Sequence, residues 1–577
     1  MKSKWFAFGC LTSFLIVVLI IFLSLSGLNK IGKEFTGSKQ FSRVNDNSFL
    51  HIALNGSIVA YNEYEEGYFN SSETSVHDLV NKITVAAKDE KISGILLEPN
   101  FISAGYADLH ELMNALEAFR ATGKQVITYL DFAMNKDYFL ASVSDKIYLN
   151  PSASAGIVLT GVGGNVLFYK DLFDKIGIDV TVLSAGKYKG AGETYSRSSF
   201  SNPVKQNISK LYDSIYNSVL ENIARNRELN KSEIKHIFEQ RDQLFINHNA
   251  ALDYKLVDEL FYRDDVIKKY FLKNKLVDYK KYNATLNPVS AYKIAVVYAQ
   301  GTIAPNMNIP SANNLSAEKL NSVLEDLRLD NSVKAIVLRV NSPGGSALIS
   351  ENITQKISQV KEQKPVIVSM GNVAASGGYY ISSLADHIFV DPFTITGSIG
   401  VVAMFPNVEG LSDKLGINSE DIGKGKYVHA FDFYKKPSNS DIAAMNKSLQ
   451  ETYLEFKERV SFGRSMSLQE VEQVAQGQVW SSFDAVANGL ADEIGILGDA
   501  IRKAAELSGT ASYQVSYFPK KKSMLQELLK KGFDLDVATK LLESELPEEF
   551  RINETKDLLI GIKNHPVQTL MPFRLQP

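Results

Sequence analysis

The residues best suited to chemistry lie in a turn that presents a single serine hydroxyl. Ser376 follows an apolar segment, residues 365–370, through a run of small residues, and two glycines come directly after it. A second apolar segment, Ala335–Val340, ends in the turn Asn-Ser-Pro-Gly-Gly at 341–345. Strand ends with such turns can direct backbone N–H groups at one point, as the oxyanion of an acyl-transfer intermediate requires. Ser376 is therefore a candidate nucleophile.

A serine nucleophile needs a neighbouring base to accept its proton. Of the eight histidines, His387 and His429 are the two between residues 291 and 508. His387 falls within an expected strand, and we therefore expect its side chain to lie on the surface of the sheet. His429 lies in a polar loop and stays open as an alternative base.

A lysine can serve as the base if burial lowers its pKa. At an ordinary pKa of about 10.4, only about 0.1% of a lysine is neutral at pH 7.5. Desolvation can bring that pKa to roughly 7–8, where the amine is useful as a base. Two corresponding segments, Gly-Lys-Tyr-Lys-Gly at 186–190 and Gly-Lys-Gly-Lys-Tyr at 423–427, follow similar Asp-Lys-(Ile/Leu)-Gly segments. Lys189 and Lys426 are therefore both candidate bases.

The chain contains two copies of one unit, because several segments recur at an offset of 241 residues (330 minus 89) or close to it. The matching pairs are 89–100 with 330–341, 145–151 with 386–392, 174–179 with 413–418 and 256–259 with 490–493. An internal repeat of this length indicates that each half is one domain. We expect the first domain at 48–290 and the second at 291–508.

Within each half, short β-rich apolar runs alternate with helical stretches. In the first half the runs Ile95–Leu97, Val126–Tyr129 and Lys146–Leu149 alternate with a helical stretch at Asp108–Thr122. This alternation predicts βαβ units and a mainly parallel sheet covered by helices, which is the α/β class.

The two copies differ at the positions that could do chemistry. Opposite Ser376 the first copy has Asn135 or Lys136, depending on where a one-residue slip falls. Opposite 343–345 it has Ile-Ser-Ala, and opposite Ser398 it has Ile157. The first copy therefore lacks both the nucleophile and the Gly-rich turn, whereas the second copy has both.

The N-terminus predicts a membrane anchor. Residues 5–28 carry no charge and would form a helix about 36 Å long at ~1.5 Å per residue, enough to cross a bilayer. We expect residues 1–28 to be a cytoplasmic end with an uncleaved transmembrane anchor. Residues 29–47 are expected to be a linker, and 509–577 a C-terminal tail without an assigned function.

Composition excludes several classes of function. The net charge of −3 gives no reason to expect a nucleic-acid partner. Cys10 is the single cysteine, which rules out a disulfide or a cysteine-based metal site within one chain. No His/Cys/carboxylate cluster has zinc spacing, and no Gly-rich phosphate loop is present, so we expect no metal, cofactor or nucleotide.

Together, the Ser376 segment, the Pro-Gly-Gly turn, Thr-Gly-Ser-Ile-Gly at 396–400 and Gly-Lys-Tyr-Lys-x-Ala-x-Glu at 186–193 resemble the signal peptide peptidase A (protease IV) family in its long tandem-domain form. The resemblance runs from the N-terminal anchor to Met571-Pro572. It implies two tandem ClpP/crotonase-like domains. It also implies a serine–lysine dyad peptidase that degrades cleaved signal peptides and other unfolded hydrophobic peptides.

The resemblance also assigns roles to individual residues. Ser376 would be the nucleophile, Lys189 the general base, and Ser398 the hydroxyl that orients the lysine. The N–H groups of Gly377 and Gly344 would form the oxyanion hole. Because the second half keeps Lys426, that lysine remains the alternative base.

The family further implies a homotetramer on the bacterial inner membrane, crossing it once, with the catalytic domains on the periplasmic or extracytoplasmic side. A different class of function is a non-proteolytic crotonase-like membrane scaffold or acyl-group-binding protein. Acyl-CoA enzymes of that fold usually place carboxylates near the oxyanion hole, where this chain has Ser376 preceded by two alanines. That difference favours the peptidase.

Overall fold

The computed structural model describes residues 42, 44–63, 74–271, 275–283, 290–305, 314–522 and 567–570 of the chain. The whole of the expected anchor, most of the expected linker and most of the tail lie outside these residues. Among the described residues, no helix has the length and apolar character needed to cross a membrane.

The first half is built on a parallel sheet of seven strands with the order β10-β6-β4-β3-β1-β11, in which β2 pairs with β1. Its strands are β1 (Ser48–Val59), β2 (Thr74–Ser75), β3 (Ile92–Ser103), β4 (Gln125–Leu130), β6 (Lys146–Leu149), β10 (Glu259–Leu260) and β11 (Leu276–Asp278). Its helices are α2 (Val76–Lys88), α3 (Tyr106–Arg120), α4 (Asn135–Ala141), α5 (Lys170–Ile176), α6 (Glu193–Ser196), α7 (Asn202–Asn226), α8 (Lys231–Glu239), α9 (His248–Asp253) and α10 (Arg263–Tyr270). Two short 3-10 helices are η1 (Gly190–Gly192) and η2 (Tyr279–Lys281).

The second half repeats this plan on an eight-stranded sheet with the order β21-β19-β17-β15-β12-β23, with β18 beside β17 and β22 beside β18. Its strands are β12 (Lys293–Gln300), β15 (Val333–Ser342), β17 (Val366–Ala375), β18 (His387–Val390), β19 (Ile395–Gly397), β21 (Val479–Ser481), β22 (Glu493–Ile494) and β23 (Gln514–Phe518). Its helices are α11 (Ala317–Leu329), α12 (Ala347–Lys361), α13 (Gly377–Ser382), α14 (Glu409–Leu415), α15 (Asn439–Arg464), α16 (Leu468–Val474), α17 (Ser482–Ala487) and α18 (Leu497–Leu507). Because β23 pairs with β12, this sheet includes a strand beyond residue 508, the boundary expected from the repeat.

Two smaller sheets complete the described part. One has three strands, β5 (Phe132–Ala133), β7 (Gly156–Ile157) and β9 (Ile246–Asn247). The other has the order β14-β13-β16-β24-β20-β8 and joins the two halves. Its strands are β8 (Asp179–Ala185), β13 (Thr302–Ile303), β14 (Asn314–Leu315), β16 (Gly344–Ser346), β20 (Val401–Asn407) and β24 (Val567–Leu570). The strand β8 comes from the first half but pairs antiparallel with β20 of the second, from Val401 opposite Ala185 to Asn407 opposite Asp179.

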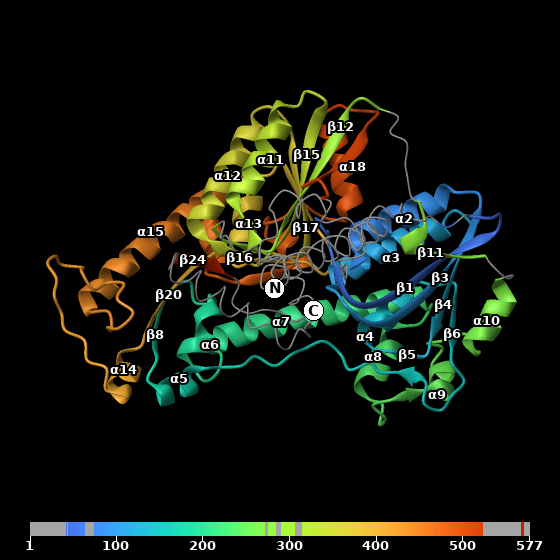
Figure 1. Ribbon diagram of the computed structural model, residues 1–577, viewed down its shortest axis with the longest axis horizontal. Coiled ribbons are helices and arrows are strands. Elements are labelled where there is room, and N and C mark those ends of the chain that lie inside the picture. The colour runs from blue at the N-terminus through green and yellow to red at the C-terminus, as the bar shows by residue number, and fades with distance from the viewer. Residues whose placement is uncertain are drawn as a thin grey trace, which may run out of the picture.

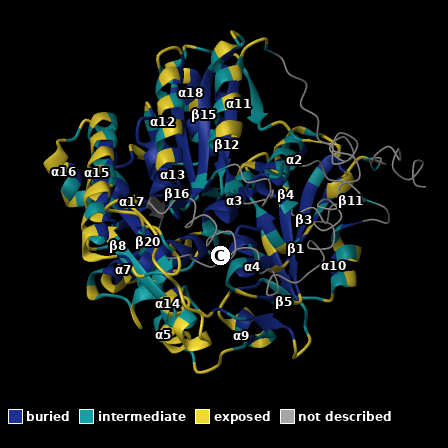
Figure 2. Cartoon of the chain, turned by 60° about the vertical axis from the view of Figure 1, so that its left-hand side comes forward, coloured by how far each residue is buried: buried dark blue, intermediate teal, exposed yellow. Residues whose placement is uncertain are grey.

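The central strands are buried because helices cover both faces of each sheet (Figure 1). Strands such as β15 therefore read as nearly continuous apolar runs rather than as alternating ones. In Figure 2 the strands are mainly dark blue, whereas helices such as α12 and α15 have yellow positions on their outer faces. The two halves share their cores: Phe393, Ile395 and Val479 pack into the core of the first half, and Ala185 packs into that of the second. The expectation of two tandem α/β domains is confirmed.

Candidate active site

Ser376 lies where strand β17 ends and helix α13 begins. Its backbone has φ 57° and ψ −116°, a region that costs a non-glycine residue about 1–3 kcal/mol and is found mainly at functional sites. The Ser376 N–H donates to Gly397 O at 2.8 Å, and the Ser376 carbonyl accepts from Tyr380 N–H at 2.8 Å. The turn is thus held on both sides of the serine, which fixes the backbone from which the hydroxyl projects.

Lys189 reaches the serine from the other half of the chain. It follows β8 after a turn at Gly186, and this turn lies against Gln476 and Gly477 of the second half. A Cβ on Gly186 would lie 2.3 Å from the Gln476 carbonyl carbon, and a Cβ on Gly477 would lie 2.5 Å from Cβ of Lys189. Both positions have positive φ, 108° and 76°, so glycine permits this close approach of the two backbones.

The lysine amine and the serine hydroxyl are in direct contact inside the protein. Nζ of Lys189 is 2.7 Å from Oγ of Ser376. The exposed fraction is 3% for Lys189 and 0% for Ser376. Burial holds the pKa of Lys189 well below its usual range, because removing the amine from water disfavours its charged form. The arrangement therefore favours the neutral form of the amine beside a buried hydroxyl.

Ser398 supplies two further contacts to the same amine. Nζ of Lys189 donates to the Ser398 carbonyl at 2.9 Å and lies 3.0 Å from Ser398 Oγ. Ser398 itself has a positive φ of 53°, and its N–H donates to Gln478 O at 2.7 Å. The lysine is thus held by three oxygens, two of them from one strained residue.

The two Gly-rich turns lie together. Helix α13 contacts β16, and a Cβ on Gly378 would lie 2.4 Å from the Ser342 carbonyl oxygen. Gly377 is the first residue of α13, and Gly344, at φ 103°, is the first residue of β16. The Gly344 N–H is 3.2 Å from Ser342 Oγ. The structure therefore brings both glycines to the neighbourhood of Ser376.

The other candidate bases lie elsewhere. Lys426 is on an exposed loop, where its amine sits 5.0 Å from the ring centre of Tyr427. His387 begins β18, and its Nε2 is 3.5 Å from Glu493 Oε2. His429 lies 3.4 Å from Asp432 and 3.5 Å from Asp421. Within the described ranges, the hydrogen-bond partner of the Ser376 hydroxyl is Lys189.

The first half shows what replaces this site when the serine is absent. Tyr138 O–H donates to Leu256 O as Tyr379 O–H does to Leu490 O, which aligns the two helices and puts Asn135 at the position of Ser376. Two positions farther on, the Asp137 carboxylate accepts from the N–H groups of Ile102 and Met134 at 2.8 and 2.9 Å. A carboxylate thus hydrogen-bonds to the backbone of the turn that corresponds to the one around Ser376.

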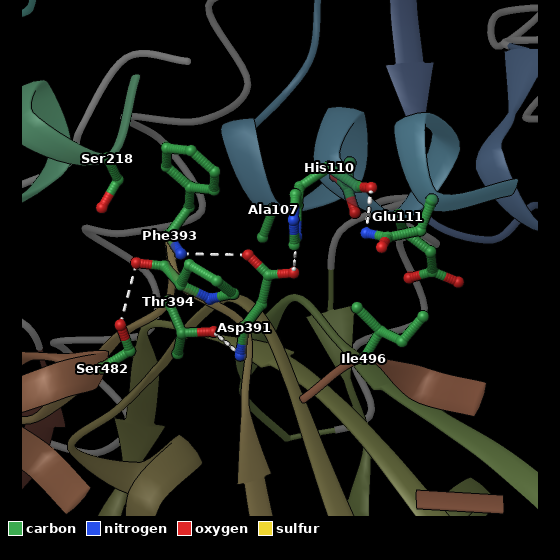
Figure 3. Close-up of polar contacts among 12 residues, drawn as sticks. Ala107, His110, Glu111, Ser218, Asp391, Phe393, Thr394, Ser482 and Ile496 are labelled. Atoms are coloured by element: carbon green, nitrogen blue, oxygen red, sulfur yellow. Dashed lines mark hydrogen bonds and ion pairs between the residues drawn. The ribbon is translucent and has the colours of Figure 1, made fainter. Parts of the chain in front are cut away.

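A buried polar contact docks the first half against the turn that leads to Ser398. Figure 3 shows His110 of α3 pointing at Asp391, which follows β18, with Nδ1 and Oδ2 2.7 Å apart. The other carboxylate oxygen of Asp391 accepts from Phe393 N–H at 3.0 Å, and Thr394 Oγ1 accepts from Asp391 N–H at 2.9 Å. The halves are also joined where Asn372 Oδ1 accepts from Ala107 N–H at 3.0 Å.

The segments of Lys189 and Ser398 are both supported by three residues not predicted from the sequence, Gln476, Gly477 and Gln478. The run Gln-Gly-Gln just before β21 was the available signal, since a glycine between polar residues marks a tight turn. The His110–Asp391 pair could not be predicted for a different reason: the two residues are 281 positions apart, and no local pattern links them.

The sequence also matches known proteins. The model of "Peptidase family S49" matches residues 118–277 and 358–511. Protease 4 of Haemophilus influenzae is 36% identical over 75% of this chain and 73% of its own length. Protease 4 of Salmonella typhi is 32% identical over 82% and 78%. The chloroplastic serine protease SPPA of Arabidopsis thaliana is 32% identical over 81% and 70%.

The family model covers both halves of the chain, and each of these relatives is matched over more than two thirds of its length. The family is thus one of peptidases, which sets aside the alternative of a non-proteolytic scaffold and makes peptides the substrates. The chain belongs to peptidase family S49 and is a serine endopeptidase.

Proposed function

We propose that Ser376 is the nucleophile of this peptidase and that Lys189 of the other half is its general base. The single observation that carries the proposal is the 2.7 Å distance between Nζ and Oγ, within hydrogen-bond reach of the proton to be transferred. Burial supports it further, since a neutral amine can accept a proton whereas an ammonium group cannot. The exposed Lys426 has no comparable burial, and we therefore assign the base to Lys189.

Ser398 orients the base in this proposal. A neutral amine has two N–H bonds and one lone pair, and Nζ has three oxygen neighbours. When the two N–H bonds point to the carbonyl and hydroxyl oxygens of Ser398, the lone pair faces Oγ of Ser376. The serine proton can then move to Nζ as Oγ attacks the substrate carbonyl.

The N–H groups of Gly377 and Gly344 would bind the oxyanion that forms in this attack. One such donor typically contributes about 3 kcal/mol to transition-state stabilisation. The Gly344 N–H has only a 3.2 Å contact with Ser342 Oγ, which a developing oxyanion could replace. As the tetrahedral intermediate collapses, the Lys189 ammonium would protonate the leaving amine. Water would then hydrolyse the Ser376 ester, with Lys189 again accepting a proton.

The substrates in this proposal are cleaved signal peptides and other unfolded hydrophobic peptides. Support comes from a shorter relative, a putative signal peptide peptidase SppA of Enterococcus faecium, 34% identical over 36% of this chain. We further propose that residues 5–28 anchor the enzyme once in the bacterial inner membrane. The catalytic domains would then lie on the periplasmic or extracytoplasmic side, where released signal peptides occur.

We also propose that the chain assembles as a homotetramer that encloses its active sites. Such an enclosure would admit unfolded chains and exclude compact domains. The full chain in detergent should therefore elute at the mass of four protomers. It should cleave an unfolded variant of a small domain much faster than the folded parent, and equal rates would contradict the enclosure.

The function is tested with the purified full chain and a synthetic signal peptide. We expect wild type to hydrolyse the peptide and Ser376→Ala to leave it intact. A second peptide of equal length, with its apolar core replaced by charged residues, should be cut more slowly. Equal cleavage by Ser376→Ala would mean that a different residue, or a contaminant, is responsible. Equal rates on the two peptides would contradict the preference for hydrophobic substrates.

A further inference from the structure

A buried arginine joins three elements of the structure. Arg339 lies on β15 and is 2% exposed. Its Nη1 donates to Ser369 Oγ at 2.8 Å and to Met370 O at 3.1 Å, both on the neighbouring strand β17. Its Nη2 donates to Glu111 Oε2 at 2.5 Å, on helix α3 of the first half. One guanidinium therefore ties together two strands of the second sheet and a helix of the first half.

The two strands lead to two of the proposed catalytic groups. Gly344, the proposed oxyanion donor, comes just after the end of β15 and five residues after Arg339 (344 minus 339). Ser376 follows directly after the last residue of β17. Because β15 and β17 are parallel, both turns lie at the same edge of the sheet, where such sheets place their ligands.

The pairing of these strands is interrupted between Arg339 and the turns. Regular pairing continues to Val340 opposite Met370, and the next pair is Ser342 opposite Ala374. Between these pairs β17 has three residues (371–373) where β15 has one (341). The contacts of Arg339 cross from β15 to β17 at the start of this irregular stretch. They therefore limit how far one turn can shift against the other.

The ion pair with Glu111 adds the first half to this joint. The Glu111 side chain is 11% exposed. Burial alone would lower the pKa of Arg339, but the nearby carboxyl groups of Glu111 and Asp108 raise it above its usual value, so the guanidinium stays charged. Removing one partner of such a pair is strongly unfavourable, because it leaves the other charge buried and uncompensated.

Helix α3 is itself held against the second half, which makes it a firm support for Glu111. His110 of this helix contacts Asp391 after β18 (Figure 3). At the start of the helix, the Asp108 N–H donates to Asn372 Oδ1 of β17 at 3.3 Å. The position of the Glu111 carboxylate is therefore fixed by the docking of the two halves as well as by its own ion pair.

The inactive copy has a different arrangement at the equivalent position. Glu98 of β3 corresponds to Arg339 (98 plus 241). In the described part of the chain, its side-chain hydrogen bonds go to His51 of β1 and to Arg263 of α10, the latter with Nε 2.5 Å from Oε1. They do not cross to β4, the counterpart of β17. The bridge between these two strands thus occurs in the copy that has the serine.

We propose that Arg339 and Glu111 are positioning residues of the catalytic site, which hold the Gly344 turn where its N–H can bind the oxyanion formed at Ser376. Neither residue touches the reacting atoms. Arg339 acts through the two strands, and Glu111 acts through Arg339. The inference rests on the proposed roles of Ser376 and Gly344. It goes beyond them because it makes the first half necessary for oxyanion binding as well as for the base.

The main test is Glu111→Gln in the full chain, because this change keeps the size of the side chain and an acceptor oxygen but removes the charge. Active sites are counted by complete reaction with a fluorophosphonate, so that kcat is given per site. We expect kcat to fall by about 10- to 100-fold, as for a catalytic group misplaced by up to 1 Å. KM should change little, because the oxyanion is bound only in the transition state.

A peptide aldehyde supplies a readout that a loss of stability alone would not move. Oγ of Ser376 adds to the aldehyde carbon, and the oxygen of the adduct takes the oxyanion position. The inhibition constant of the aldehyde should therefore rise in Glu111→Gln by about the factor by which kcat falls. If Glu111 only stabilised the fold, fewer sites would react with the fluorophosphonate, whereas kcat per site and the inhibition constant would be those of wild type.

The matched control is Glu98→Gln, which changes a buried carboxylate–guanidinium pair at the equivalent position of the first copy. It should lower the melting temperature but leave kcat per site unchanged. Arg339→Lys keeps the charge but lacks the planar fork that reaches two elements at once, and it should lose activity as Glu111→Gln does. The double variant Arg339→Lys/Glu111→Gln should lose little more than the worse single variant, because the two residues act as one unit.

The outcomes separate this inference from the proposed function. Wild-type kcat and aldehyde inhibition in Glu111→Gln, beside an inactive Ser376→Ala, would overturn the inference alone. Equal losses in Glu98→Gln, or additive losses in the double variant, would also overturn it. An active Ser376→Ala would contradict the proposed function and the inference together. If Glu111→Gln does not fold, Glu111→Asp, whose carboxylate is one methylene short of Arg339, is measured in the same way.

Discussion

Lys189 and Ser376 are 187 residues apart in the sequence, yet Nζ of the lysine is 2.7 Å from Oγ of the serine. The antiparallel pairing of β8 with β20 brings them together, because β8 leads to Lys189 and β20 follows Ser398. Each half of the repeat thus supplies one member of the pair. This division explains why the first half can have Asn135 where the second has its serine.

The buried amine predicts how activity depends on pH. Burial lowers the pKa of Lys189 from its ordinary value, and only the neutral amine can accept the serine proton. We therefore expect kcat/KM to rise with pH through the lowered pKa and to level off before pH 10.5. A profile that keeps rising to the ordinary pKa of lysine would contradict this, as would an unchanged profile in Lys189→Met.

A glycine beside the lysine should be essential for its position. Gly477 and Gly489 both have φ 76°, but a Cβ on Gly477 would lie 2.5 Å from Cβ of Lys189, whereas one on Gly489 meets open space. Misplacing a catalytic group by about 1 Å can cost about 10²-fold in rate. We expect such a loss in kcat for Gly477→Ala, measured beside Gly489→Ala, which has the same backbone strain. Similar losses in both variants would assign the effect to strain alone.

The Ser398 hydroxyl should contribute modestly to the rate. It lies 3.0 Å from Nζ of Lys189, and one hydrogen bond is worth about 1–1.5 kcal/mol, or about tenfold in rate. Ser398→Ala keeps the backbone carbonyl contact and should lower kcat by about this factor. Ser383→Ala removes another fully buried hydroxyl, which bonds to Tyr380 O, and should leave kcat unchanged. Equal kcat values in the two variants would refute the orienting role of Ser398.

The His110–Asp391 contact should couple the two halves. Asp391 is 1% exposed, and disturbing a buried hydrogen-bonded partner costs about 1–3 kcal/mol. Asp391→Asn should therefore lower the unfolding temperature, and also kcat, because its turn leads to Ser398. Glu221→Gln alters an exposed ion pair with Lys231 and should change neither. A normal melting temperature for Asp391→Asn would mean that the contact does not hold the halves together.

Local patterns in the sequence were enough to predict the α/β class, the repeat and the strand–turn–helix around Ser376. These depend on short-range periodicity and on glycines at fixed places in turns. The choice between Lys189 and Lys426 could not be made from pattern, since both follow similar segments. Burial distinguishes them, and it arises from the packing of Gly477 and Ser398 around one lysine only. The strand β24 was also unpredictable, because its partners lie more than 160 residues away (567 minus 403).

The peptidase is proposed to use Ser376 and Lys189 from different halves of one chain. The most direct test compares kcat/KM for an uncharged fluorogenic peptide among wild type and the alanine variants of Ser376, Lys189 and Lys426. Each variant is first shown to have the melting temperature and the oligomeric state of wild type. Loss of a member of a catalytic pair should cost about 10³-fold or more. We predict that loss for Ser376→Ala and Lys189→Ala, with Lys426→Ala close to wild type. An active Lys189→Ala beside an inactive Lys426→Ala would contradict the assignment of Lys189 as the base.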